Sequence, residues 1–76
     1  MNEKEFLESI KSMLETEEDI EMETDLMDIE RWDSFSMMAF IAMAEEKYKV
    51  TIQPFAVAEA VLVEDLFNVV KKAMEG

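Results

Sequence analysis

The stretch Trp32-Asp33-Ser34-Phe35-Ser36 lies where an acidic, turn-rich segment gives way to a long run of good helix formers. Asp33 or Ser34 suits the N-cap of the helix that follows, because a short oxygen side chain can accept a backbone N–H that the first turn leaves unpaired. We therefore expect Ser34 at the start of a helix, exposed, with its hydroxyl directed at solvent.

Helical periodicity over residues 34–48 separates two faces, at about 100° per residue. The side chains expected to face the core are Met37, Phe40, Ile41, Ala44 and Tyr48. The opposite face carries Phe35, Met38, Ala39, Ala42 and Glu46. This outer face is unusually apolar, and a chain of 76 residues can hardly bury one helix on every side. We therefore interpret Phe35, Met38, Ala42 and Glu46 as a partner-binding surface.

Three further segments complete an all-helical pattern. Residues 3–15 are amphipathic, with Asn2 as the expected N-cap and Glu5 as its capping-box partner. Residues 49–62 hold a short helix of about two turns, with Pro54 in its first turn and Val61 near its end. Residues 62–75 form the last helix. The expected inward-facing side chains are Phe6, Leu7, Ile10, Met13, Leu14, Val50, Ile52, Val63, Leu66, Phe67, Val70 and Met74. The predicted fold is a small four-helix bundle of three main helices and one short one.

Residues 16–33 form a long acidic connection between the first two helices. Its apolar residues are interleaved with the acids and are expected to fix the loop to the core: Ile20, Met22, Leu26, Met27 and Ile29. A calcium loop of EF-hand type is not indicated, because that loop needs a turn glycine and the only glycine is Gly76. We predict no metal site.

Composition limits the function further. The chain is expected to form one domain, residues 1–76. Its net charge of −12 argues against binding to nucleic acid or to an anionic membrane, and it favours partners with a basic surface. Without cysteine or histidine, the usual catalytic nucleophile–base pairs cannot be assembled, so an enzyme is not expected. No apolar run is long enough to span a bilayer and no signal peptide is evident, so we expect a cytoplasmic protein that does not insert into membranes.

The segment Asp33-Ser34-Phe35, preceded by Trp32 and followed by an apolar helix that ends at Tyr48, resembles the attachment site of acyl carrier proteins. That family carries Asp-Ser-Leu or a near variant at the start of its second helix. A Trp before Asp-Ser is common in stand-alone carriers outside the main fatty-acid set. The resemblance spans nearly the whole chain, including its length, its acidity and its long first loop.

The resemblance implies that Ser34 carries covalent 4′-phosphopantetheine, whose thiol holds an acyl or aminoacyl group as a thioester. Asp33 would orient Ser34 or contact the modifying enzyme, and Trp32 would pack beside the arm or cover the end of the core. The implied partners are a phosphopantetheinyl transferase and acyl-activating and acyl-transferring enzymes, with the carrier a monomer.

One departure from the family affects the expected pathway. Carriers of fatty-acid synthesis have acids early in the second helix, where this chain has Ser36 and Ala39. The departure favours a specialised biosynthetic pathway, with a partner whose docking surface is more apolar. The alternative from another class is an acidic helical protein-interaction module that is never modified.

Overall fold

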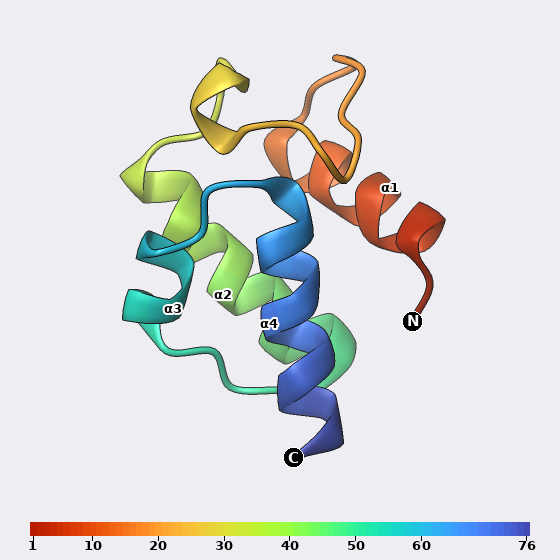
Figure 1. The fold of residues 1–76 in the computed structure, drawn as a ribbon, viewed down its shortest axis with the longest axis vertical. Helices are drawn as coiled ribbons and strands as arrows, with labels where there is room; N and C mark the ends of the chain where they lie inside the picture. The colour runs from red at the N-terminus through yellow and green to blue at the C-terminus, as the bar shows by residue number, and fades with distance from the viewer.

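Four α-helices and one short 3-10 helix make up the computed structural model, which describes all residues from Met1 to Gly76 (Figure 1). In chain order they are α1 (Glu3–Leu14), η1 (Leu26–Asp28), α2 (Ser34–Tyr48), α3 (Pro54–Ala58) and α4 (Val63–Glu75). The only extended pairing is an isolated bridge between Asp25 and Leu62. The predicted all-α bundle of three main helices and one short helix is therefore confirmed.

Helices α1 and α2 begin at side-chain caps. The backbone N–H of Glu5 donates to Asn2 Oδ1 over 2.8 Å at the start of α1, as the sequence predicts. The helix α1 ends at Leu14, because Glu15 takes a left-handed conformation with φ of 53°. Lys49 ends α2 in the same way with φ of 59°. Glycine is the usual residue at such positions, so neither end carried a sequence signal.

The core lies where α1, α2 and α4 meet. Phe6, Phe40, Leu66 and Val70 are each 0 % exposed. The Phe6 ring meets Phe40 edge-on with centroids 6.2 Å apart, and it meets Phe67 in the same manner at 5.3 Å. Such edge-to-face contacts between buried rings add about 0.5–1.5 kcal/mol to the stability that their burial already provides. The aromatic contacts therefore link α1 to both α2 and α4.

The acidic connection crosses the end of the bundle where α1 stops and α2 and α4 begin (Figure 1). Its carbonyl groups complete the start of α4: Val63 N–H donates to Thr24 O and Glu64 N–H donates to Met22 O, each over 2.9 Å. These N–H groups belong to the first turn of α4, whose N-cap residue is Leu62, with no oxygen side chain to offer. The loop thus supplies acceptors that the sequence of α4 lacks.

Three details of the prediction were wrong. Met27 is 87 % exposed, whereas the other four apolar residues of the connection are buried, because Met27 lies in η1 and projects away from the bundle. Met74 is 48 % exposed, since the last turn of α4 extends beyond the core. The short helix α3 ends at Ala58 rather than at about residue 61, because Val61 and Leu62 donate their backbone N–H groups to the Asp65 carboxylate ahead of α4.

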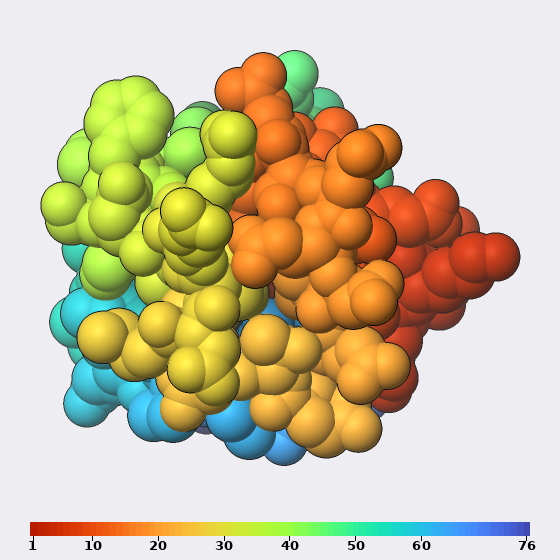
Figure 2. All heavy atoms as spheres, turned by 90° about the horizontal axis from the view of Figure 1, so that it is seen from above, coloured from red at the N-terminus to blue at the C-terminus, as the bar shows by residue number.

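Acidic residues gather over the connection. Between Glu15 and Asp33 there are ten acids and one base, Arg31. Figure 2 shows that the atoms of this segment, orange to yellow, cover most of the end of the molecule seen from above. No helix in the structure is both long enough and apolar enough to cross a membrane.

We expect the melting temperature at neutral pH to rise when sodium chloride is added. The charge of −12 makes the folded chain repel itself, and salt screens exposed charges over about 10 Å at 0.1 M. Thermal unfolding followed by circular dichroism at low and high salt measures the effect. A melting temperature that does not respond to salt would contradict it.

Candidate functional site

The first turn of α2 places Ser34 at the surface. Asp33 is the N-cap, and its Oδ1 accepts the backbone N–H of Ser36 over 2.9 Å. Ser34 is the first residue of the helix and is exposed. The side-chain hydrogen bonds of this turn are made by Asp33 and Ser36 and do not use the Ser34 hydroxyl. The turn is therefore held by its neighbours, and the expected exposure of Ser34 is confirmed.

The carboxyl group of Asp33 is held in its ionised form. The backbone N–H of Ser36 lowers the pKa of Asp33 below its ordinary value of 3.8, and the hydroxyl of Ser36 lowers it further. Hydrogen bonds donated to a carboxylate favour the charged form, which explains the direction of the shift. At neutral pH the residue before Ser34 therefore carries a full negative charge.

Ser36 has a structural role that the sequence did not predict. It is 7 % exposed, and its Oγ lies 2.7 Å from Arg31 O and 3.0 Å from Asp33 Oδ1. Ser36 therefore faces inward and does not replace a surface acid on α2. An N-cap at Asp33 accounts for the hydrogen bond from the backbone N–H of Ser36, but no local pattern predicts the bond from its hydroxyl to Arg31 O.

Trp32 packs against the core from the residue before the cap. Its side chain is half-buried among the apolar residues that surround the core, and its backbone N–H donates to Ile29 O over 3.1 Å. This position agrees with the second of the two roles expected for it, covering the end of the core. Trp32 and Ser36 thus anchor the turn on either side of Ser34.

The rotation of α2 agrees with the helical pattern. Phe40 and Ala44 are fully buried, whereas Phe35 is 81 % exposed and Met38 is 72 % exposed. Ala42 and Glu46 are exposed on the same outer face, and Ala39 is half-buried at its edge. Phe55 on α3 is also exposed, at 66 %, although the sequence analysis did not single it out.

Two hollows lie along the contact between α1 and α2. The first hollow has a volume of about 280 Å³ and lies beside Ser34, because Asp33 and Phe35, which flank Ser34 in the chain, both line it. The residues that line it are Met13, Leu14, Glu15, Arg31, Asp33, Phe35, Ser36 and Ala39. The second, of about 370 Å³, is lined by Glu8, Ser9, Ser12, Met13, Met43 and Lys47. Met13 lines both hollows, and we call the two hollows together the α1–α2 groove.

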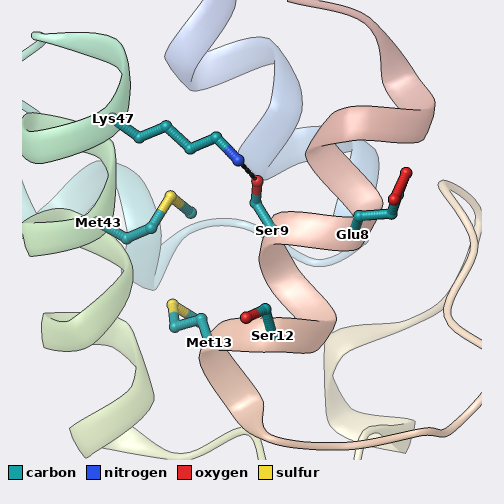
Figure 3. Close-up of a pocket in the computed structure, with 6 residues that line it drawn as sticks. All are labelled: Glu8, Ser9, Ser12, Met13, Met43 and Lys47. Carbon is teal, nitrogen blue, oxygen red and sulfur yellow. Dashed lines mark hydrogen bonds between the residues drawn. The ribbon is translucent and has the colours of Figure 1, made fainter.

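The far end of the α1–α2 groove is polar. Figure 3 shows Lys47 reaching from α2 to donate a hydrogen bond to Ser9 Oγ on α1, with Met13 and Met43 projecting into the space between the helices. The Glu8 side chain points away from Lys47 in the same view. No cluster of three or more His, Cys, Asp or Glu side chains that could hold a metal ion is found in the structure.

No model of a known protein family matches the chain, and no curated protein or solved structure is significantly similar to it.

Replacing Asp33 with alanine is expected to lower the melting temperature by about 5 °C, because the first turn of α2 loses its cap. Asp33→Asn is the matched control, since asparagine keeps an acceptor oxygen but does not ionise. The two variants and the wild type are compared by thermal unfolding over a range of pH.

The pH dependence of this effect follows from the lowered pKa. A carboxyl group with a depressed folded-state pKa stabilises the fold above its unfolded pKa, here near 3.8, and this contribution is lost as the pH falls through the folded value. The stability of the wild type relative to Asp33→Asn should therefore be constant near neutrality and decrease below about pH 4. A difference that grows on acidification would contradict the assignment of Asp33 as the cap.

Proposed function

We propose that the chain is an acyl carrier protein that bears 4′-phosphopantetheine on Ser34. One observation supports this most: Ser34 is the exposed first residue of α2, and the side-chain hydrogen bonds of that turn fall on Asp33 and Ser36 instead. Its hydroxyl is therefore accessible to a modifying enzyme, while the turn around it stays ordered. Ser36, the nearest other hydroxyl, is buried and hydrogen-bonded.

Attachment requires little from the carrier itself. Ser34 Oγ forms a phosphodiester with the phosphate of the arm, the diphosphate bond of coenzyme A breaks, and the nucleotide part leaves with the released electron pair. A transferase supplies the base that removes the serine proton, which suits a chain without histidine or cysteine. Once attached, the arm supplies a thiol that holds the acyl group as a thioester.

The exposed apolar residues beside Ser34 support a docking role. Phe35 and Met38 are large, apolar and mostly exposed, as residues at the centre of a binding surface commonly are. Ala42 and Glu46 extend this surface along α2, and the acidic connection lies next to its start. We therefore propose partner enzymes with an apolar contact site and a basic rim, acting in a specialised biosynthetic pathway in the cytoplasm.

The test is modification of the purified chain. It is incubated with coenzyme A and a phosphopantetheinyl transferase of broad specificity, and the intact mass is measured. The proposal predicts an increase of one phosphopantetheine group per chain. Heat-denatured chain is the control, because the transferase must recognise the folded first turn of α2. An unchanged mass for the folded chain would contradict the proposal.

An interaction module that is never modified is the second candidate. The exposed side chains of Phe35 and Met38 suit it equally well, because a binding surface needs no attached group. The two candidates differ only at Ser34, which the module would not use. The mass measurement therefore separates them without knowledge of the partner.

A further inference from the structure

Methionine supplies all the sulfur in the chain, which has eight methionines and no cysteine. Those that pack in or against the core are Met13, Met22, Met37 and Met43. Met27 and Met38 are the most open to solvent, with 87 % and 72 % of their surfaces exposed. A thioether must meet an oxidant from solution in order to react, so Met27 and Met38 should be oxidised first.

Met38 lies one helical turn after Ser34. Residues four apart on a helix are neighbours on its surface, with Cβ atoms about 6 Å apart. Ser34 is the exposed first residue of α2, and the exposed Phe35 follows it. An enzyme that reacts with the Ser34 hydroxyl through an interface of standard size covers about 800 Å², a patch roughly 30 Å across. Met38 therefore lies within the area that such an enzyme covers.

Oxidation changes the Met38 side chain at one atom. The thioether sulfur attacks one oxygen of hydrogen peroxide and the O–O bond breaks. The second oxygen leaves as hydroxide and takes the proton of the first, so the products are a sulfoxide and water. The sulfur is oxidised and the peroxide is reduced. A sulfoxide is polar and accepts hydrogen bonds, so covering it with an apolar surface costs free energy.

We propose that Met38 is an oxidation site that controls the attachment of phosphopantetheine to Ser34. The thioether form gives the modifying enzyme an apolar contact one turn from the serine, and the sulfoxide form puts a polar group in the same place. The change is reversible, because methionine sulfoxide reductase restores the thioether at the expense of a dithiol. This inference rests on the proposed function, because it needs an enzyme that acts on Ser34.

Peptide mapping tests which sulfur reacts. The chain, before any arm is attached, is treated with dilute hydrogen peroxide and digested with trypsin. The peptide of residues 12–31 contains Met13, Met22 and Met27, and that of residues 32–47 contains Met37, Met38 and Met43. Each peptide thus has one exposed methionine and two that are shielded. We expect the first oxygen atom on Met27 in one peptide and on Met38 in the other. Oxidation of Met37 or Met43 ahead of Met38 would overturn the proposal.

The rate of attachment tests what the oxidation does. After catalase has removed the peroxide, the chain is incubated with coenzyme A and a transferase of broad specificity, and the intact mass is followed over time. We expect attachment to slow by about tenfold or more, as when a central apolar contact of an interface is lost. Methionine sulfoxide reductase with dithiothreitol should restore the rate. Melting curves establish that the oxidised chain is folded.

Matched variants assign the effect to one sulfur. Met38→Leu has a side chain of similar volume that peroxide does not oxidise, and Met27→Leu is the same change on η1. Each variant is compared with its own untreated sample, so only the effect of oxidation is measured. Peroxide should not slow attachment to Met38→Leu, and it should slow attachment to Met27→Leu as much as to the wild type. Equal slowing of both variants, or the reverse pattern, would show that Met38 is not the responsible residue.

The outcomes separate this inference from the function on which it rests. If the untreated chain gains no phosphopantetheine, the proposed function fails and the inference fails with it. If the untreated chain gains the arm and the chain oxidised at Met38 gains it at the same rate, the chain is a carrier whose loading Met38 does not control.

Discussion

Phe40→Ala is expected to destabilise the fold by about 3–5 kcal/mol, the usual cost of removing a buried phenylalanine ring. Phe40 is 0 % exposed and meets Phe6 edge-on, so its loss opens a cavity between α1 and α2. A domain of this length has a total free energy of unfolding of about 4–11 kcal/mol. The variant should therefore lose a large part of its stability and unfold at a much lower urea concentration than the wild type, as urea denaturation followed by circular dichroism would measure.

Met38→Ala is the matched control, two residues earlier on the same helix. Because Met38 is 72 % exposed, its truncation should change the free energy of unfolding by only about 0.5 kcal/mol. Its effect should appear in binding, where loss of a central apolar contact can cost about 2 kcal/mol or more. If Met38→Ala unfolded the chain and Phe40→Ala did not, α2 would be rotated relative to the structure and the outer face would be wrongly assigned.

Ser34→Ala is expected to abolish attachment of phosphopantetheine completely, because no other exposed hydroxyl occupies the start of α2. The fold should persist, since the cap of this helix is Asp33 and the hydrogen bonds of the turn do not use the Ser34 side chain. Intact mass after treatment with the transferase measures the first effect and thermal unfolding measures the second. Uptake of the arm by the alanine variant would show that Ser34 is not the site.

Ser36→Ala is the control for the preceding variant. It should still be modified, although it should be somewhat less stable, because Ser36 Oγ donates to Arg31 O and Asp33 Oδ1 and a lost hydrogen bond costs about 1 kcal/mol. The two variants are therefore expected to behave in opposite ways. Ser34→Ala should lose the modification and keep its stability, whereas Ser36→Ala should keep the modification and lose stability.

The arrangement of α2 could be predicted from the sequence because one helical period decides it. Phe40 and Ala44 fall on one side and Phe35 and Met38 on the other, whatever surrounds the helix. The cap signal was equally local, since it needs only a short oxygen side chain before a run of helix formers; the sequence left Asp33 and Ser34 as candidates, and the structure has Asp33. Local patterns thus gave both the helix and the position of Ser34 at its start.

Other features depend on contacts between distant residues, which a local pattern does not encode. The Thr24 carbonyl accepts from Val63, almost forty residues away, and this pairing fixes which apolar residues of the connection reach the core. Met27 belongs to the apolar set in sequence but lies outside it in space. The α1–α2 groove also requires two helices to be placed together, so Met13 and Met43 could not be paired beforehand.

The central claim is tested most directly by locating the modification within the chain. Trypsin cleaves after Arg31 and Lys47, and the peptide of residues 32–47 contains Ser34 and Ser36 but neither Ser9 nor Ser12. After treatment with the transferase, tandem mass spectrometry of this peptide should place one phosphopantetheine on Ser34. An unmodified peptide, or a group on Ser36, would contradict the account.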